Sequence, residues 1–220
     1  MRLLNFRRGT CGVTVATIIC LTPMGCGPQL GYTKSSQEVI FTMRGDIVTN
    51  TSVLVEDVDV EGFQILSHPE YGSDEQHVFF RGEKIWGADP ATFSLLEFPF
   101  SHDDKHVFNG NVLIVDATPR DFRIVRCSKS ALSLTGGRGA EPVFGDLSDR
   151  VPPGGVAWVF TTWSLSKEEV FFGPCTVQGG RPDTFRAMSA SEGTDDEGAF
   201  YYAAYRFESK EAWLQSLKQL

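Results

Sequence analysis

The sequence predicts an all-β protein built from tandem units of about 30 residues, with a short C-terminal capping helix. Three observations lead to this fold class: a phenylalanine motif that recurs four times, short aromatic runs separated by glycine turns, and one amphipathic helical pattern at the end of the chain. The 220 residues, 41% of them hydrophobic, supply a substantial core and exclude a wholly disordered chain. We therefore expect β-hairpin or three-strand repeats that form a curved or propeller-like array of sheets.

The recurring motif has two elements in a fixed phase. The first is a phenylalanine followed by one polar and two apolar residues, at residues 63–66, 93–96, 122–125 and 185–188. The second is a charged stretch followed by a short aromatic strand, at residues 74–80, 103–108, 167–172 and 195–202. The valine of the second element precedes the next phenylalanine by 15 residues in three copies, namely 78–93, 107–122 and 170–185. This fixed spacing indicates an array of one supersecondary unit.

Within a unit, glycine and proline mark the expected turns. Two β-prone runs flank Arg81-Gly82, and the next copy carries Asn109-Gly110, which is a favoured hairpin dipeptide. Asp89-Pro90 predicts a second turn that delivers Phe93 into a third strand of the same unit. The sequence thus favours units made only of strands and turns.

A segment rich in glycine and proline interrupts the repeats at residues 136–155. Because 9 of its 20 residues are Gly or Pro, it cannot be regular throughout. The 63 residues from Phe122 to Phe185 are close to two periods, so we expect one diverged unit there that has absorbed this insertion. A strand is predicted to resume at residues 156–163.

The C-terminal residues 208–220 carry the helical pattern. Ser209 is the expected N-cap, and the apolar residues that follow lie on one stripe, namely Trp213, Leu214, Leu217 and Leu220. We expect this helix to cover one end of the β-repeat domain, residues 38–207, because an open sheet edge presents unpaired backbone groups.

The first 25 residues have the layout of an export signal. Arg2, Arg7 and Arg8 are followed by an uncharged run up to Gly25, with no acidic residue. The apolar stretch 13–21 is much shorter than the roughly 20 residues that a transmembrane helix needs. Residues 1–25 are therefore predicted to be a cleaved signal peptide, and residues 26–37 a flexible linker.

Cys26, preceded by Gly25, resembles the lipidated cysteine of bacterial lipoproteins. That family has a leucine three positions before the cysteine, where this chain has Pro23. The resemblance implies acylation of Cys26 and a protein held by its lipid to the outer membrane of the cell envelope, facing the periplasm or the surface. An ordinary cleaved signal peptide is the alternative. Removal of residues 1–25 leaves 17 basic and 28 acidic residues, a formal charge of −11.

The repeat itself resembles that of the DKNYW repeat family of bacterial exported proteins. The resemblance rests on charged residues, His-Val-aromatic, Asn-Gly and Ala-Asp-Pro-x-Thr-Phe in sequence, and it is close over residues 63–125 and clear again over 167–202. The copy at Arg81-Gly82 departs from the Asn-Gly of the family. The resemblance implies an exported repeat fold and brings no catalytic residues with it.

Cysteines and histidines supply the remaining chemical candidates. Once the signal peptide is cleaved and Cys26 acylated, Cys127 and Cys175 are the two thiols left, and an oxidising compartment favours a disulfide between them. Two separately buried thiols are the alternative. The segment with His102, Asp103, Asp104 and His106 is a candidate metal site, although a solvated turn beside a strand explains it more simply, and no cofactor is expected.

Residues that the repeat does not explain are the candidates for a binding surface. These are Arg81, Trp86, Trp163, Arg181 and the acidic run Asp195 to Glu197. Twenty basic against 28 acidic residues exclude a nucleic-acid partner, because clustered cations are lacking. The familiar nucleophile and metalloprotease motifs are absent from the sequence.

These observations favour a non-catalytic envelope lipoprotein, a repeat scaffold that binds a protein or glycan partner. One concrete version is an immunity protein against an envelope-acting toxin, since an acidic surface matches a basic partner. The alternative is an exported hydrolase that acts on cell-wall or carbohydrate substrates, because two acidic residues distant in sequence can meet in space.

Overall fold

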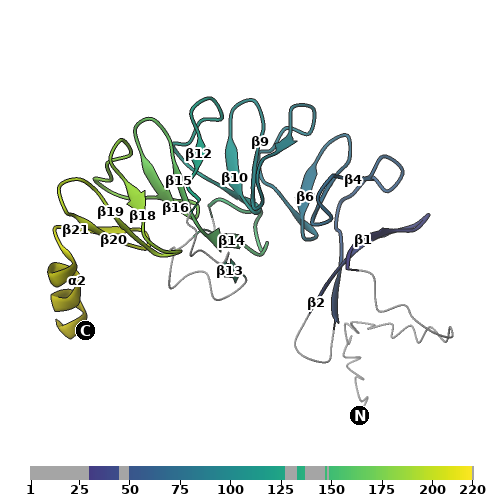
Figure 1. The fold of residues 1–220 in the computed structure, drawn as a ribbon. Coiled ribbons are helices and arrows are strands. Elements are labelled where there is room, and N and C mark those ends of the chain that lie inside the picture. Colours follow the sequence, from purple (N-terminus) through teal and green to yellow (C-terminus); the bar gives the residue numbers. More distant parts are fainter. Residues whose placement is uncertain (1–29, 45–49, 127–132, 137–146, 148, 220) are drawn as a thin grey trace, which may run out of the picture.

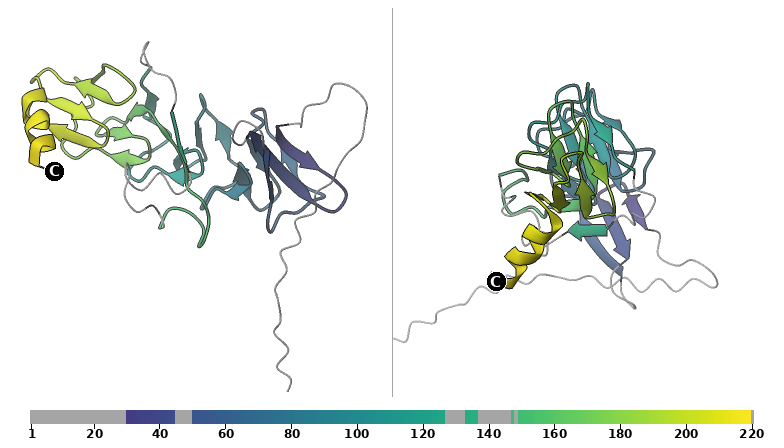
Figure 2. Two further views of the ribbon diagram at one scale, coloured as in Figure 1. Left: turned by 90° about the horizontal axis from the view of Figure 1, so that it is seen from below. Right: turned by 60° about the vertical axis from the view of Figure 1, so that its left-hand side comes forward.

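The computed structural model describes residues 30–44, 50–126, 133–136, 147 and 149–219. This part of the chain forms a row of small antiparallel sheets that curves into an open arch, with one short helix at the C-terminal end (Figure 1). The sheets follow one another in chain order along the arch, as the view from below also shows (Figure 2). The predicted all-β repeat array with a C-terminal helix is confirmed.

Four of the sheets are meanders of four short strands. Sheet B contains β4 (Gln64–Ile65), β5 (Tyr71–Ser73), β6 (Val78–Phe80) and β7 (Glu83–Lys84). Sheet C contains β8 (Ser94–Leu95), β9 (Phe100–His102), β10 (Val107–Asn109) and β11 (Val112–Leu113). Sheet D contains β12 (Arg123–Ile124), β15 (Trp163–Leu165), β16 (Val170–Phe172) and β17 (Cys175–Thr176). Sheet F contains β18 (Arg186–Ala187), β19 (Glu192–Thr194), β20 (Phe200–Tyr202) and β21 (Tyr205–Phe207).

Two sheets differ from this plan. Sheet A, at the start of the described chain, has three strands in the order β1 (Gly31–Lys34), β2 (Val39–Arg44) and β3 (Asn50–Leu54). Sheet E is a hairpin of β13 (Ser133–Gly136) and β14 (Trp158–Thr161), and it lies on the concave side of the arch (Figure 1).

The phenylalanine that precedes each first strand joins two neighbouring sheets. Its ring contacts an aromatic ring of the preceding sheet, on the second strand of sheets B, C and D and on β1 of sheet A, and another ring on the third strand of its own sheet. The contacts to the preceding sheet are Tyr32–Phe63 at 5.2 Å, Tyr71–Phe93 at 6.1 Å, Phe100–Phe122 at 5.1 Å and Trp163–Phe185 at 4.9 Å between ring centroids. Those within the same sheet are Phe63–Phe79, Phe93–Phe108, Phe122–Phe171 and Phe185–Tyr201, at 5.1 to 6.4 Å.

A small residue stands at the centre of each second strand, and in sheets B and F the phenylalanine ring lies directly over it. That residue is Gly72, Ser101, Ser164 or Gly193, and all four are buried. A Cβ atom added to Gly72 would lie 2.3 Å from Cζ of Phe63, and one added to Gly193 would lie 2.5 Å from Cε2 of Phe185. The ring therefore needs a small side chain beneath it.

The repeat unit has four strands, and this corrects two details of the sequence prediction. Phe93 does not lead into a third strand of sheet B, because β8 pairs with β9 and so opens the next sheet. The second strands were missed because their central Gly or Ser weakens the strand signal. The turn at Asn109-Gly110 is shifted by one residue, since Asn109 pairs with Val112 and leaves Gly110 and Asn111 in the turn.

The interval between Phe122 and Phe185 holds one unit, where the sequence predicted two. β12 pairs with β15 across the insertion, with Arg123 opposite Leu165. Sheet E is therefore inserted between the first and second strands of sheet D. The predicted strand at residues 156–163 is confirmed in part, because it divides into β14 and the start of β15.

The C-terminal helix α2 (Lys210–Ser216), followed by the 3₁₀ turn η2 (Leu217–Gln219), caps sheet F. Ser209 is its N-cap as predicted, and the Ser209 hydroxyl accepts a hydrogen bond from the backbone N–H of Ala212 at 3.2 Å. Trp213 packs on Phe200 and Tyr202, with ring centroids 5.1 and 4.8 Å apart. Among the described residues, no helix has the length and apolar character to span a bilayer.

Only part of the predicted apolar stripe of α2 contacts the sheet. Leu214 and Leu217 are 45% and 49% exposed, and Leu220 lies outside the described residues. Sheet F differs from the sheets before it at one position. Glu192 stands there, where sheets A to D carry the aromatic residue that contacts the next phenylalanine. The carboxylate of Glu192 lies 3.7 Å from Nζ of Lys210 at the start of the helix.

We expect Gly72→Ala to lower the free energy of unfolding by about 1–3 kcal/mol, because the new methyl overlaps the Phe63 ring. The matched control is Thr33→Ala, which changes the equivalent position of sheet A, where the residue is exposed. This control should change stability by less than about 0.5 kcal/mol. Urea unfolding followed by circular dichroism measures both variants, and equal effects would contradict the packing described.

Candidate functional site

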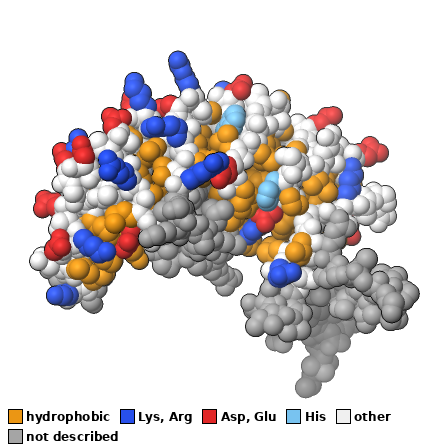
Figure 3. Space-filling model, in the orientation of Figure 1, with side chains coloured by type: hydrophobic (Ala, Val, Ile, Leu, Met, Phe, Trp, Pro, Cys, Tyr) orange, Lys and Arg blue, Asp and Glu red, His pale blue; other side chains and the backbone are white. Residues whose placement is uncertain are grey.

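A cleft of about 590 Å³ opens where sheets A and B meet the inserted hairpin. Its walls come from β1 and β2, from the segment that leads into β5, from the end of β6, and from β14. The side chains that line it include Leu30, Met43, Arg44, His68, Glu70, Arg81 and Trp158. Figure 3 shows hydrophobic side chains gathered toward the concave side of the arch, whereas many charged side chains stand on the convex loops and at the far end.

Arg81 forms a fixed ion pair in the wall of this cleft. Its Nε and Nη2 donate to the two carboxylate oxygens of Glu70 at 2.9 and 2.8 Å. The guanidinium carbon lies 5.3 Å from the ring centroid of Trp158 and 5.5 Å from those of Phe80 and Phe160. Because the side chain of Arg81 is only 13% exposed, the pair is held in one geometry.

Other aromatic side chains pack in the same region. The His68 ring stacks on Phe98 with centroids 4.4 Å apart, and His68 Nδ1 accepts a hydrogen bond from the backbone N–H of Glu70 at 3.4 Å. The Tyr32 hydroxyl accepts a hydrogen bond from the N–H of Gly82 at 2.9 Å. Burial raises the pKa of Tyr32, so this hydroxyl stays neutral.

Two asparagines of sheet C attach the inserted hairpin to the array. Asn109 accepts a hydrogen bond from the Phe160 N–H at 2.7 Å and donates to the Phe160 carbonyl at 3.0 Å. Asn111 accepts from the Trp158 N–H at 2.7 Å and donates to the Val156 carbonyl at 2.8 Å. Both side chains thus replace a neighbouring strand along one edge of β14, and they fix Trp158 in the cleft wall.

Gly110 stands between these asparagines because the two chains approach each other closely. Its φ is +61°, and an added Cβ would lie 1.9 Å from the Trp158 carbonyl oxygen. The sequence predicts a turn at this segment but does not predict that Asn109 and Asn111 anchor the inserted hairpin. The sequence feature that indicates this anchor is a pair of asparagines, Asn109 and Asn111, on either side of Gly110.

The structure separates the predicted binding-surface residues. Arg81 lines the cleft, and Trp86 is 49% exposed in a separate groove of about 310 Å³ that Pro152 and Pro153 also line. The prediction for Trp163 is wrong, because this residue is 1% exposed. Trp163 is the second-strand aromatic residue of sheet D and donates through Nε1 to the Ser189 carbonyl at 3.1 Å.

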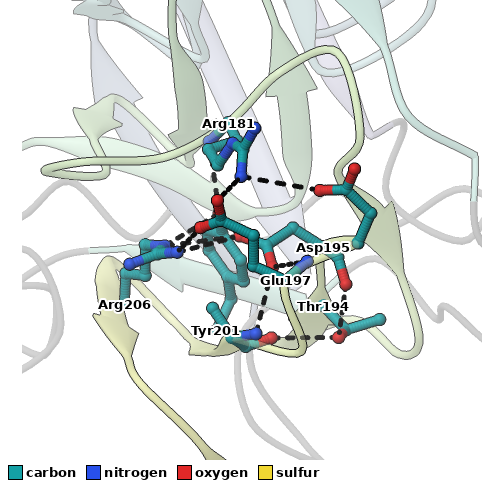
Figure 4. Close-up of polar contacts among 8 residues, drawn as sticks. Arg181, Thr194, Asp195, Glu197, Tyr201 and Arg206 are labelled. Atoms are coloured by element: carbon teal, nitrogen blue, oxygen red, sulfur yellow. Dashed lines mark hydrogen bonds and ion pairs between the residues drawn. The ribbon is translucent and has the colours of Figure 1, made fainter.

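Arg181 and the acidic run lie together in a network of ion pairs (Figure 4). Arg181 pairs with Glu197 and lies 3.6 Å from Asp196. Arg206 binds Asp195 at 3.1 Å and Glu197 at 3.4 Å. These charges therefore satisfy one another on sheet F.

The metal candidate His102, Asp104 and His106 does not form a metal site. The buried Asp103 instead binds the neighbouring groups: His106 Nδ1 lies 3.1 Å from its Oδ2, and His102 Nδ1 lies 2.9 Å from its backbone oxygen. Asp104 donates its backbone N–H to Thr92 Oγ1 at 3.3 Å. Within the described ranges, no group of three or more His, Cys, Asp and Glu side chains is placed to hold a metal ion.

The cysteine predictions lie at the margins of the described chain. Cys26 and Cys127 both fall outside the described residues, so acylation and the disulfide stay predictions. Cys175 is half-buried at the start of β17, and burial raises the pKa of its thiol.

Recurring acids close the hairpin between the second and third strands. Oδ1 of Asp74 and of Asp103 each accepts two backbone N–H groups, and Asp195 accepts those of Glu197 and Ala199. Burial alone raises the pKa of Asp103, but the N–H donors of Lys105, His106 and Asp89 outweigh it and hold the pKa below its usual value. Backbone N–H donors likewise outweigh burial and lower the pKa of Asp74, whereas the pKa of Asp195 is lowered against burial by the Tyr201 hydroxyl, the Ala199 N–H and the Arg206 guanidinium.

The fold thus defines a β-repeat protein with a hairpin inserted into one of its repeats. The model of the DKNYY family matches residues 36–218, and the chain belongs to this family. The family expected from the repeat is confirmed. No curated protein and no solved structure matches the chain.

We expect Arg81→Ala to lower the free energy of unfolding by about 2 kcal/mol, because Glu70 loses its charged donor in a partly buried site. Arg126→Ala is the matched control, since Arg126 and Glu97 form an ion pair whose side chains are 80% and 48% exposed. That control should cost less than about 0.5 kcal/mol. Thermal and urea unfolding measure both, and a larger effect at Arg126 would refute the assignment.

The lowered carboxyl pKa values predict a loss of stability in acid. A carboxylate whose folded pKa lies below its unfolded value stabilises the fold above the unfolded value, and this contribution disappears as the pH falls below about 4. Asp103→Asn should flatten the dependence of unfolding free energy on pH in this range. The matched control is Asp104→Asn, which changes the exposed neighbouring acid, and a flattening no larger than in this control would contradict the prediction. Urea titrations at a series of pH values decide the matter.

Proposed function

We propose that this protein is a non-catalytic scaffold of the bacterial cell envelope, held to the outer membrane by a lipid on Cys26, that binds a protein or glycan partner. The concave cleft between sheets A and B is the proposed binding surface. An immunity protein against a toxin that acts in the envelope is one form that this function would take.

The observation that carries the proposal is the convergence of non-repeat features on one cleft. Arg81 replaces the glycine that occupies the first turn position in sheets C and D, Gly110 and Gly173. The inserted hairpin interrupts the repeat and brings Trp158 to the guanidinium of Arg81. Features that the fold of the repeat does not require are therefore found at the same place.

The charged side chains of the repeat also support a scaffold. Asp74, Asp103 and Asp195 are engaged by backbone donors that close their hairpins. Arg181, Arg206 and their acidic partners bind one another. The fold itself thus uses these groups, and the cleft supplies the contact surface of a binding protein.

The membrane anchor can be tested in intact cells of the source bacterium. Wild-type protein should incorporate labelled palmitate and sediment with membranes, and Cys26→Ser should do neither. If the wild-type protein incorporated no labelled palmitate, the proposed lipid anchor would be refuted.

The binding surface is tested by photocrosslinking from single positions. p-Benzoylphenylalanine at Met43, in the cleft, should yield one discrete adduct. The same group at Asp183, an exposed residue at the other end of the array, should not yield that adduct. An adduct that Arg81→Ala and Trp158→Ala leave undiminished would show that the cleft is not the surface used.

A further inference from the structure

In the part of the chain that the structure describes, sheet A has no counterpart of the first strand of sheets B, C, D and F. Its β1 corresponds to the second strands, because Tyr32 has the same two roles as Tyr71 and Trp163. Each packs against the phenylalanine of the following meander, and each polar tip bonds to backbone of the following unit. These bonds are Tyr32 Oη with Gly82 N, Tyr71 Oη with Pro99 O, and Trp163 Nε1 with Ser189 O.

No described strand occupies the place of this first strand beside β1. In the complete sheets, the residues beneath the phenylalanine are buried: Ser101 and Ser164 on the second strand, and Phe79, Phe108, Phe171 and Tyr201 on the third strand, are 0% exposed. The equivalent residues of sheet A are Thr33, which is exposed, and Ile40, which is half-buried. No phenylalanine of the described chain covers them.

The outer edge of β1 also has the backbone groups that a first strand would use. Among the described strands, β1 pairs only with β2 and therefore stands at the edge of sheet A. In sheet B the corresponding edge of β5 pairs with β4, and the Leu66 N–H donates to the Tyr71 carbonyl at 3.0 Å. Lys34 does not block the edge with its ammonium, because Nζ donates to the carbonyls of Glu61 and Phe63 at 2.8 and 3.1 Å.

We propose that the outer edge of β1 accepts an extended segment of a partner protein, which adds as an antiparallel strand and places an aromatic ring over Thr33 and Ile40. This inference rests on the proposed binding function and specifies its partner as a polypeptide. Peptide groups satisfy a strand edge and a glycan does not. The segment that fits has the sequence Phe-polar-aliphatic, as in residues 63–65, 93–95 and 122–124.

In the sequence, the place of this strand falls at the end of the proposed signal peptide. Aligned with sheet B, in which Gln64 stands seven residues before Tyr71, the missing strand would begin at Gly25, with Met24 in the place of Phe63. Cleavage before Cys26 removes both residues. The edge is therefore left for a second polypeptide, and it adjoins the cleft, which Leu30 and Gly31 also line.

The test uses a synthetic peptide that copies residues 88–97 of this chain, Ala-Asp-Pro-Ala-Thr-Phe-Ser-Leu-Leu-Glu. Titrated into the mature protein without its lipid, it should shift the amide NMR signals of residues 31–34 and 40. A peptide with Phe93→Ala should bind at least about 10-fold more weakly, because it lacks the ring that fills the site. A peptide with Ser94→Pro should also lose binding, because it lacks a pairing N–H.

Variants of the protein test whether the peptide binds over Thr33. Thr33→Ser introduces the residue found in β9 and β15 and should tighten binding several-fold, whereas Thr33→Glu should abolish it. Thr51→Ser and Thr51→Glu, at an exposed position of β3 in the same sheet, should leave the affinity unchanged. Equal binding of the Phe93→Ala peptide, or signal shifts centred on β3, would overturn the proposal.

Two further results separate this inference from the proposed function. A dimer paired through β1 in sedimentation experiments, with no peptide binding, would overturn it in favour of a second copy of this chain. Loss of peptide binding together with an adduct at Met43 would refute strand addition while the scaffold function stands. Peptide binding at β1 would support strand addition even if Met43 gave no adduct and Cys26 carried no palmitate. Those two negative results would count against the proposed cleft and the proposed anchor.

Discussion

The packing of one phenylalanine between two neighbouring sheets is the interaction on which the structure depends. Strands of two or three residues form sheets that are too small to be stable alone, so each unit must bury its apolar face against the next. The ring of Phe63, Phe93, Phe122 or Phe185 provides that contact and requires a small residue beneath it. The 590 Å³ cleft lies beside sheet A, where this packing begins.

This constraint explains where the chain tolerates an insertion. The hairpin of β13 and β14 enters between the first and second strands of sheet D, and Phe122 still contacts Phe100 and Phe171. Asn109 and Asn111 then bind the hairpin through side chains, so that the backbone of β10 and β11 keeps its own partners. An element foreign to the repeat is thereby held rigidly on the concave face, and the Arg81–Glu70 pair is covered by aromatic rings.

Much of the repeat could be predicted from the sequence, because its residues act locally. The phenylalanines, the hairpin acids and the Ser209 cap were found at their positions. The second strands were missed because Tyr71-Gly72-Ser73 has little strand character in isolation. Trp163 was assigned to the surface because the insertion hides its equivalence to Tyr71 and Phe100. Asn109 and Asn111 act on residues 45 to 51 positions away, and no spacing in the sequence shows such contacts.

Glu192 has a consequence for how such proteins lengthen or shorten during evolution. A duplicated unit placed ahead of sheet F would find an aromatic neighbour to receive its phenylalanine. A copy placed after sheet F would meet a carboxylate already paired with Lys210. An array extended beyond sheet F would therefore require an aromatic residue in place of Glu192, whereas a unit inserted ahead of sheet F would require no such change.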